Sequence, residues 1–389
     1  MKNSVKHINT LSELEVRTAQ EQQTLLGFEE GNSEFDCIDM EYPYDPEKIR
    51  VESKIFPIFQ IKSMINKGTL FLRPEFQRNT VWDVVRKSRL IESLMLRIPI
   101  PAFYFDEDND GKKTVIDGLQ RLTAINDYMD DSFKLKGLQY LQNECGDMLF
   151  SELKQKYRTR IEDAQLTVNI LDPRSPADVK FDIFRRVNTG GVPLNAQEIR
   201  NVLSNEQTRH FLISMAKSEE FTKATRDRVN DIRMDAQELC LRFIAFYTHY
   251  DAKTHCIQSS ASIGTMLDKC ILDLNNRSKK ELKELFSIFK LSMNKCYALF
   301  GDKAFSKPNN EHIINKVLFT SWAVTLSRYD YPLIKFEQLQ NLAIKRLYER
   351  LERDPEYFTS ISSSTSTKKS IRKQFQTAYE IMEDLLNAK

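Results

Sequence analysis

The residues best suited to chemistry lie in one short run, residues 115–122, which reads VIDGLQRL. β-Forming residues lead into Asp117 and Gly118, and Gln120 and Arg121 open an amphipathic run. The segment therefore predicts a strand, a tight turn and the first turn of a helix. Backbone N–H groups and the helix dipole make such a place favourable for an anion, usually a phosphate.

Each side chain of this turn suits a task in phosphate chemistry. Gly118 lets a phosphate approach the backbone, and Arg121 offers a planar fork of donors for its oxygens. Asp117 could hold Mg²⁺ or orient an attacking water, and Gln120 could hydrogen-bond a phosphate or that water. On spacing alone an ordinary strand-to-helix turn is equally consistent, with Gly118 for geometry, Asp117 as a cap and Arg121 in solvent.

A polar loop lies upstream of this turn, just before a predicted helix. Gln77 and Arg78 stand there between the aromatic residues Phe76 and Trp82. Arg78 could supply a second positive charge to the same phosphate site. Alternatively, the two aromatic side chains pack and Arg78 pairs with a surface carboxylate.

A third polar segment lies downstream. Arg186 and Asn188 stand beside the Gly-Gly pair at 190–191, a loop that could close over a ligand. A plain helix–loop–helix connection explains much of this segment, because Asn195 followed by Glu198 three residues later resembles a capping box. That connection does not by itself require arginine and asparagine beside the glycines.

The near balance of positive and negative charges limits the kinds of partner that the sequence predicts. The chain of 389 residues has 57 Lys+Arg against 55 Asp+Glu, a formal net charge of +2. Any nucleic-acid surface must therefore be a local patch rather than a property of the whole chain. Hydrophobic residues make up 41% of the chain, which is enough for buried cores in two domains.

Several other classes of protein do not fit. No GxxxxGK[ST] run is present, which excludes a P-loop, and the five His and six Cys lack the spacing of a structural zinc site. The N-terminus lacks an apolar signal core, and the longest apolar stretch, residues 317–326, is too short to span a bilayer. We therefore expect a soluble, cytoplasmic protein with reduced thiols and no membrane contact.

The elements that must position the polar segments are of two kinds. Strand patterns cover residues 51–57, 102–105, 114–117, 133–138 and 166–171, with helices at 58–67, 82–97 and 177–187. Beyond residue 195 helical periods dominate, at 196–203, 208–217, 236–250, 279–300, 312–327, 336–351 and 368–386, with a Ser/Thr-rich mobile loop at 359–367. This pattern predicts an α+β fold: a peripheral segment at 1–45, an α+β domain at 46–200 and an all-helical domain at 201–389.

Taken together and in order, the motifs resemble one family. They are FQR at 76–78 with Trp82, LIESL at 90–94 with IPIP at 98–101, VIDGLQRL at 115–122, and residues 184–191 with Leu194 and Glu198. This set closely resembles the N-terminal domain family of GmrSD-type (type IV) restriction endonucleases. Family members that cut DNA themselves carry a C-terminal HNH nuclease domain, and the helical half of this sequence resembles no such domain, so we expect a stand-alone form.

The resemblance implies a ParB/sulfiredoxin-like fold with a small mixed sheet in residues 46–200, whose glycine-and-arginine turn holds nucleotide phosphates. The family's Asp-Gly-Gln-Gln-Arg motif, which is tied to nucleotide hydrolysis that regulates DNA cleavage, maps onto residues 117–121. Asp117, Gln120 and Arg121 would then be catalytic, with Asp117 also serving Mg²⁺. The sequence departs from the family at Leu119, where glutamine is usual, so we expect nucleotide binding more firmly than hydrolysis.

The leading hypothesis is thus a nucleotide-binding, potentially NTP-hydrolysing component of a DNA restriction or anti-phage defence system. Gln77, Arg78, Gly118, Arg186 and Asn188 would bind the nucleoside triphosphate. Candidate partners are DNA, a separate nuclease or other defence subunit, and a second copy in a homo-oligomer. The alternative is a non-enzymatic DNA-binding module that uses the same arginines on backbone phosphates. Nuclease activity of this chain ranks last, because only Asp117 is evident as a metal ligand.

Overall fold

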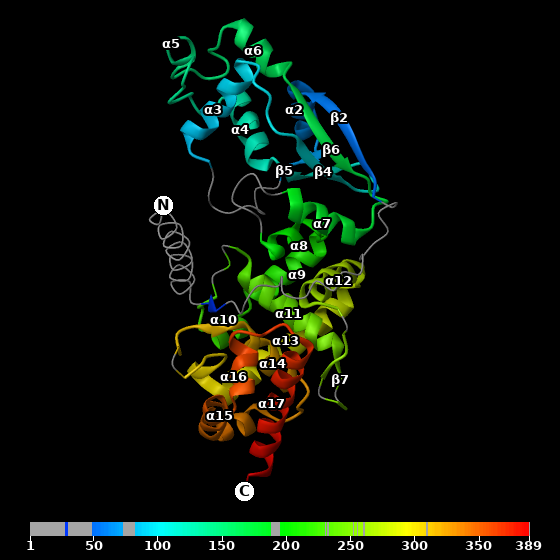
Figure 1. The fold of residues 1–389 in the computed structure, drawn as a ribbon, viewed down its shortest axis with the longest axis vertical. Helices are drawn as coiled ribbons and strands as arrows, with labels where there is room; N and C mark the ends of the chain where they lie inside the picture. Colours follow the sequence, from blue (N-terminus) through cyan, green and yellow to red (C-terminus); the bar gives the residue numbers. More distant parts are fainter. Residues whose placement is uncertain are drawn as a thin grey trace, which may run out of the picture. The chain divides into compact units, whose positions relative to one another are not determined.

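The computed structural model describes residues 28–29, 49–72, 82–187, 195–229, 231, 233–251, 253–254, 256–259, 261–308 and 310–388 (Figure 1). It divides into two compact units, Glu41–Val202 on the one hand and Met1–Met40 with Leu203–Lys389 on the other. We call them the sheet unit and the helical unit. A small mixed sheet followed by helices confirms the predicted α+β class.

The sheet unit is built on five strands in the order β2-β6-β4-β5-β3. They are β2 Val51–Pro57, β3 Leu70–Phe71, β4 Phe103–Glu107, β5 Lys113–Asp117 and β6 Gln165–Leu171. The β2–β6 and β4–β5 pairs are antiparallel, so β4 and β5 form a hairpin, whereas β4–β6 and β3–β5 are parallel.

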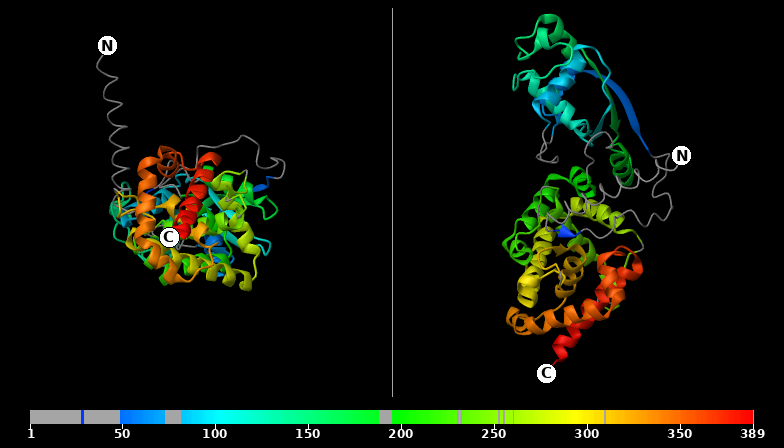
Figure 2. Two further views of the ribbon diagram at one scale, coloured as in Figure 1. Left: turned by 90° about the horizontal axis from the view of Figure 1, so that it is seen from below. Right: turned by 60° about the vertical axis from the view of Figure 1, so that its left-hand side comes forward.

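Helices cover one face of this sheet, as Figures 1 and 2 show. They are α2 Ile58–Asn66, α3 Val84–Met95, α4 Leu119–Met129 and α6 Gln155–Glu162, joined by the short α5 Gln142–Cys145. Alternation along β6 explains the arrangement, because Leu166, Val168 and Ile170 are buried in the common core while Gln165 and Thr167 are exposed.

The helices that follow β6 are α7 Ala177–Val187 and α8 Ala196–Leu203, both with the predicted bounds. The helix α7 packs against β5 and is tied to β4 by an ion pair between Lys180 Nζ and Asp106 Oδ1 at 2.5 Å. Burial raises the pKa of Asp106, and the charge and hydrogen bond of Lys180 oppose that shift. Asp106 and Lys180 thus anchor α7 to the hairpin that carries the candidate turn.

Local signals set the helix ends. The Asp83 carboxylate accepts the Arg86 N–H at 2.8 Å and so caps α3. After α2, Gly68 adopts a left-handed φ of 66°, and its N–H donates to Ile65 O, as expected for a glycine that ends a helix.

The predicted strand at 133–138 is wrong. Its backbone N–H groups bond to side chains and loops instead of a neighbouring strand: Lys136 N–H donates to Ser88 Oγ and Leu138 N–H to Gln142 Oε1. The apolar side chain of Leu135 is buried all the same. Because no strand that the structure describes pairs with residues 133–138, this apolar run forms an irregular segment.

The helices of the helical unit surround α14 Lys316–Leu326, which is buried along its whole length. The other α-helices of this unit are α9 Glu206–Ala216, α10 Glu219–Thr225, α11 Asp235–His249, α12 Ile263–Asn276, α13 Lys279–Phe300, α15 Leu333–Arg353, α16 Pro355–Ser362 and α17 Lys368–Asn387. Two-residue strands pair as β1 Phe28–Glu29 with β9 Ile314–Asn315, and β7 Tyr250–Asp251 with β8 Cys256–Ile257. Every residue of α14 is buried, because Phe319, Trp322 and their neighbours pack on all sides.

Two expectations for the helical unit need correction. The helix predicted from residue 312 begins only at Lys316, because the Asn315 side chain accepts the Val317 and Leu318 N–H groups and caps it there. The Ser/Thr-rich segment 359–367 is not a loop throughout: it includes the end of α16, and Gln374 Nε2 donates to the carbonyls of Ser360 and Thr365. In the described part of the chain, no helix combines the length and the apolar character needed to cross a bilayer.

Candidate functional site

The turn singled out in the sequence has the predicted strand–turn–helix form. The strand β5 ends at Asp117, and α4 begins at Leu119. Gly118 between them is the N-cap, with a left-handed φ of 92°. A Cβ at Gly118 would lie 2.2 Å from Cδ1 of Phe103, so close packing and backbone conformation both require glycine here.

The Arg121 guanidinium donates hydrogen bonds to protein groups. Its Nη2 donates to Asp117 Oδ2 at 2.8 Å and to Ala102 O at 3.2 Å, and Nη1 donates to Pro101 O. The guanidinium carbon lies 4.3 Å from the centre of the Phe103 ring, and 13% of the side chain is exposed. Arg121 therefore clamps the Pro101–Ala102 backbone to the end of β5.

Burial has the largest effect on the pKa values of Asp117 and Arg121. It raises the pKa of Asp117, against the effects of the Arg121 charge and of hydrogen bonds from the Gly118 N–H and Arg121. Burial likewise lowers the pKa of Arg121, and Asp117 opposes that shift. Each group thus stabilises the charged form of the other, and the two act as one unit.

The position where the sequence departs from the family motif lies in the core. Leu119 is 4% exposed and packs in the hydrophobic cluster beneath the sheet. Gln120, the next residue, is half-buried at the surface of α4. The first turn of α4 contains no acidic residue, and no side chain caps it. An anion at this N-terminus would meet the positive end of the helix dipole.

The structure says less about the other predicted site residues. Arg186 is exposed on α7, while Gln77, Arg78 and Asn188 lie outside the described residues. The Asn195–Glu198 capping box is confirmed: Asn195 N–H donates to Glu198 Oε2 at 2.6 Å, and Glu198 N–H to Asn195 Oδ1 at 2.7 Å. Among the residues that the structure describes, no group of three His, Cys, Asp or Glu could hold a metal ion, so Asp117 is a single candidate ligand.

Comparison with known proteins agrees with the motifs. Residues 60–204 match the family model described as GmrSD restriction endonuclease, N-terminal domain. This chain contains a GmrSD N-terminal domain. No curated protein and no solved structure matches the chain. The match spans the 117–121 turn, Arg186 and most of the sheet unit, and the domain indicates a role in a restriction or defence system.

Sequence reasoning missed the residues that support the turn of the GmrSD domain. Phe103 lies beneath Gly118 and Arg121, and the carbonyls of Pro101 and Ala102 receive the guanidinium. The Ile-Pro-Ile-Pro run at 98–101 is part of the family motif, but the sequence did not predict its contact with Arg121. Backbone carbonyls carry no side-chain signature, so no residue pattern marks them as acceptors.

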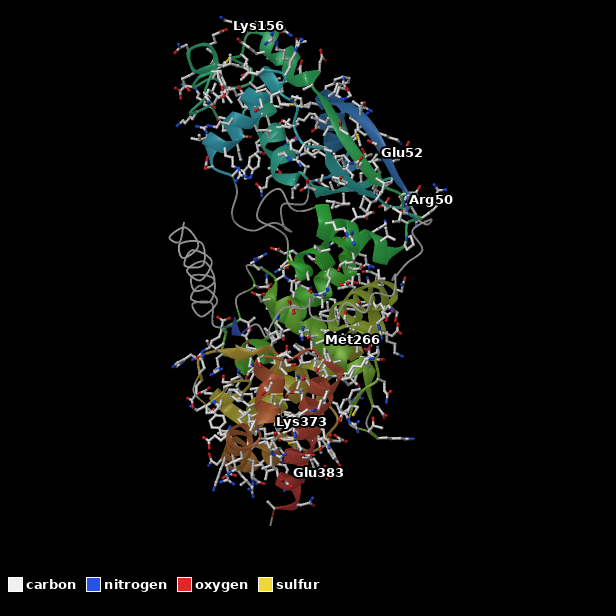
Figure 3. All side chains as sticks on the ribbon, viewed as in Figure 1. Arg50, Glu52, Lys156, Met266, Lys373 and Glu383 are labelled. Atoms are coloured by element: carbon white, nitrogen blue, oxygen red, sulfur yellow. The ribbon has the colours of Figure 1, made fainter. Side chains whose placement is uncertain are left out.

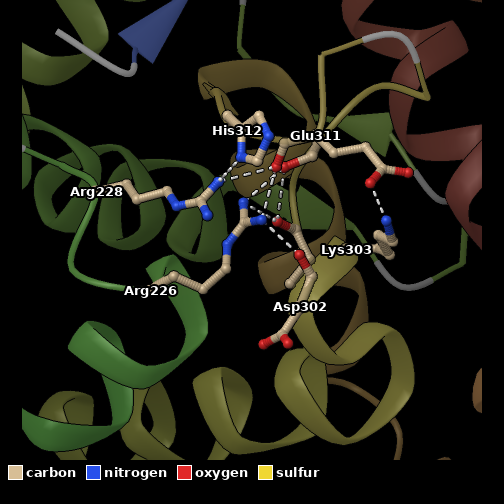
Figure 4. Close-up of polar contacts among 8 residues, drawn as sticks. Arg226, Arg228, Asp302, Lys303, Glu311 and His312 are labelled. Atoms are coloured by element: carbon tan, nitrogen blue, oxygen red, sulfur yellow. Dashed lines mark hydrogen bonds and ion pairs between the residues drawn. The ribbon is translucent and has the colours of Figure 1, made fainter.

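Outside the GmrSD domain, the helical unit has a second polar cluster that the sequence did not reveal (Figure 4). Arg226 Nη1 donates to the carbonyls of Asp302 at 2.5 Å and Glu311 at 2.7 Å, and its Nη2 donates to Ser306 Oγ at 2.7 Å. Arg228 Nη1 donates to Nδ1 of His312 at 3.1 Å, which places the imidazole proton on Nε2. Arg226 thus ties the end of α10 to the loop before β9.

Replacing Arg226 by alanine should lower the free energy of unfolding of the helical unit by about 2–3 kcal/mol, because carbonyls that accept from a charged donor lose it. Urea denaturation followed by Trp322 fluorescence in a Trp82→Phe background measures this unit. Arg346→Ala is the matched control, since Arg346 makes only a 3.5 Å contact with Glu349 at the surface. An equal effect of the two substitutions would contradict a clamping role for Arg226.

Proposed function

We propose that the GmrSD domain binds a nucleoside triphosphate at the N-terminus of α4, and that the bound nucleotide controls a restriction or defence activity. The supporting observation is the geometry of the turn. The helix α4 starts without a capping side chain, directly after a left-handed glycine, with the Arg121 guanidinium beside its first turn. Backbone N–H groups at the start of α4 would donate to phosphate oxygens.

Arg121 has a double role in this proposal. Its contacts with Asp117, Pro101 and Ala102 use three of the five N–H donors of a guanidinium. The remaining donors would contact the nucleotide, so phosphate binding would not break the clamp. Arg78, Arg186, Gln77 and Asn188 would add further contacts in the nucleotide-bound protein.

Asp117 would hold Mg²⁺ together with phosphate oxygens of the nucleotide. A single carboxylate suits this task, because Mg²⁺ is often bound through one or two carboxylates plus substrate phosphates. When bound, the ion would neutralise phosphate charge. Hydrolysis would need Asp117 and Gln120 to orient the water, since Leu119 lies in the core. DNA cleavage would be carried out by a separate nuclease or defence subunit.

A charge placed in the first turn of α4 tests the binding site. Gln120→Glu should weaken binding of ATP, GTP, CTP or UTP, whichever binds the wild type, by about tenfold, because a carboxylate would lie within a few ångströms of the phosphates. The same charge should stabilise the helix by roughly 0.3–1 kcal/mol through the macrodipole, so the fold should survive. Isothermal titration calorimetry with and without Mg²⁺ measures the affinity.

Gln155→Glu is the matched control, because Gln155 is the first residue of α6, another first turn without an acidic residue. It makes the same change of charge in the same unit and should leave nucleotide affinity unchanged. No binding of any nucleoside triphosphate by the wild type, or equal affinity of Gln120→Glu, would refute the proposal. Binding of DNA instead, with an affinity that falls steeply with salt, would favour the DNA-binding alternative.

A further inference from the structure

The strand β2 forms one edge of the five-stranded sheet and pairs with β6 on its other side. It is seven residues long and carries exposed apolar side chains, with Val51 43% and Ile55 65% exposed. Figure 3 labels Arg50 and Glu52 along this edge. A long edge strand with apolar side chains is a template for pairing with another strand.

The register with β6 determines which backbone groups face outward. Asp172 N–H donates to Arg50 O, and Ile58 N–H donates to Ala164 O, so the even-numbered residues of β2 are hydrogen-bonded to β6. The odd-numbered residues therefore present their polar groups at the free edge. Val51, Ser53 and Ile55 each offer one N–H and one C=O there.

The sequence of this edge is self-complementary about Ser53. It reads Arg50-Val-Glu-Ser-Lys-Ile-Phe56, so each residue has a suitable partner at the same distance on the other side of Ser53. In an antiparallel pair of two such strands, Glu52 faces Lys54 of the second copy and Val51 faces its Ile55. Arg50 faces Phe56 of the second copy, a cation beside an aromatic ring.

We propose that β2 is a homodimer interface, in which two copies pair antiparallel about a twofold axis at Ser53. The odd-numbered residues then form the hydrogen-bonded pairs, Val51 with Ile55 and Ser53 with Ser53. Glu52 and Lys54 form the non-hydrogen-bonded pairs, in which opposing side chains lie closest. The two five-stranded sheets join into one continuous sheet. The proposal is independent of nucleotide binding.

The charges of Glu52 and Lys54 favour the register with its axis at Ser53 over the registers with the axis one residue away. A shift that puts the axis at Lys54 places two lysines face to face, and a shift to Glu52 does the same with two glutamates. A lysine on an edge strand usually opposes association. Within one copy Lys54 Nζ lies 2.9 Å from Glu52 Oε2, and the two side chains are 42% and 65% exposed, so each can reach the second copy.

Charge reversal tests the interface on the full-length chain. In sedimentation velocity, the wild type should form a species of twice the 45.5 kDa of one chain. Glu52→Lys and Lys54→Glu should each raise the dimer dissociation constant by at least about tenfold, because like charges meet twice. The double variant Glu52→Lys/Lys54→Glu should dimerise like the wild type.

Mixing the two single variants distinguishes repulsion at this edge from a damaged fold. The Glu52→Lys chain carries two lysines and the Lys54→Glu chain two glutamates, so an equimolar mixture should form heterodimers. A monomeric wild type, single variants that dimerise as tightly as the wild type, or a mixture that stays monomeric would each overturn the proposal.

Cross-linking tests the register. The Cα atoms of a hydrogen-bonded antiparallel pair lie ≈ 5.5 Å apart, within the range that a disulfide spans. Ser53→Cys should therefore form a covalent dimer under oxidising conditions, whereas Ile55→Cys alone should not, because its partner is Val51. The wild type controls for native thiols such as the partly exposed Cys256. Equal cross-linking of the two variants would refute the twofold axis at Ser53.

Discussion

Alanine in place of Gly118 should lower the free energy of unfolding of the sheet unit by about 2–5 kcal/mol. Roughly 1–2 kcal/mol comes from the left-handed conformation, which a Cβ disfavours. A further ~1–3 kcal/mol comes from overpacking, because the new Cβ would meet the Phe103 ring, which is fully buried and cannot move aside. Urea denaturation followed by Trp82 fluorescence in a Trp322→Phe background measures the effect.

Gly68→Ala separates the two causes. Gly68 has a similar φ of 66°, but nothing lies within 4 Å of the position that its Cβ would take. This variant should therefore lose only the conformational part. Because the Phe103 ring also supports the Arg121 guanidinium, Gly118→Ala should in addition abolish nucleotide binding if the proposed site is right. Equal destabilisation by the two substitutions would show that the Phe103 contact is unimportant.

Glu92→Gln should destabilise the sheet unit by about 2–4 kcal/mol, because a charged acceptor of three backbone N–H groups is lost. Glu92, in α3, is 4% exposed. Its carboxylate accepts the N–H groups of Gln139 at 2.9 Å, Tyr140 at 2.7 Å and Leu141 at 2.8 Å. A glutamine has the same shape but directs one amide N–H group at donors.

The same carboxylate should make the sheet unit sensitive to acid. Burial raises the pKa of Glu92, but the three backbone hydrogen bonds outweigh it and the net pKa is lowered. A lowered pKa contributes stability above the unfolded value of about 4.3 and loses it as the pH falls through the folded value. The stability difference between the wild type and Glu92→Gln should therefore shrink below about pH 4.3.

Glu152→Gln controls for the substitution itself. Glu152 also accepts a backbone N–H, from Leu149 at 2.7 Å, but at an exposed position. Water can replace that contact, so this variant should lose less than about 0.5 kcal/mol. If Glu92→Gln were equally mild, or its effect independent of pH, the carboxylate would not hold the 139–141 loop as the structure indicates.

Local patterns predicted most elements of the GmrSD domain and many of the helices beyond it. The bounds of β2, α7, α8 and α13 agree with the predicted ones, and the 115–122 run forms the expected turn. Hydrophobic period and turn residues act over a few positions, so they are visible in the chain. The strand predicted at 133–138 does not form, because an apolar run becomes a strand only where the edge of another strand is available for pairing.

The chemistry of the turn depends on contacts that cross longer distances in the chain. Arg121 has the predicted position, but its acceptors are carbonyls about 20 residues away, and Leu141 lies 49 residues from Glu92. Arg226 bonds the carbonyl of Glu311, 85 residues away. Since every residue has a carbonyl, residue types alone could predict an anion-favouring turn and its family. Only the packed chain could show that Arg121 holds the turn together and that Leu119 belongs to the core.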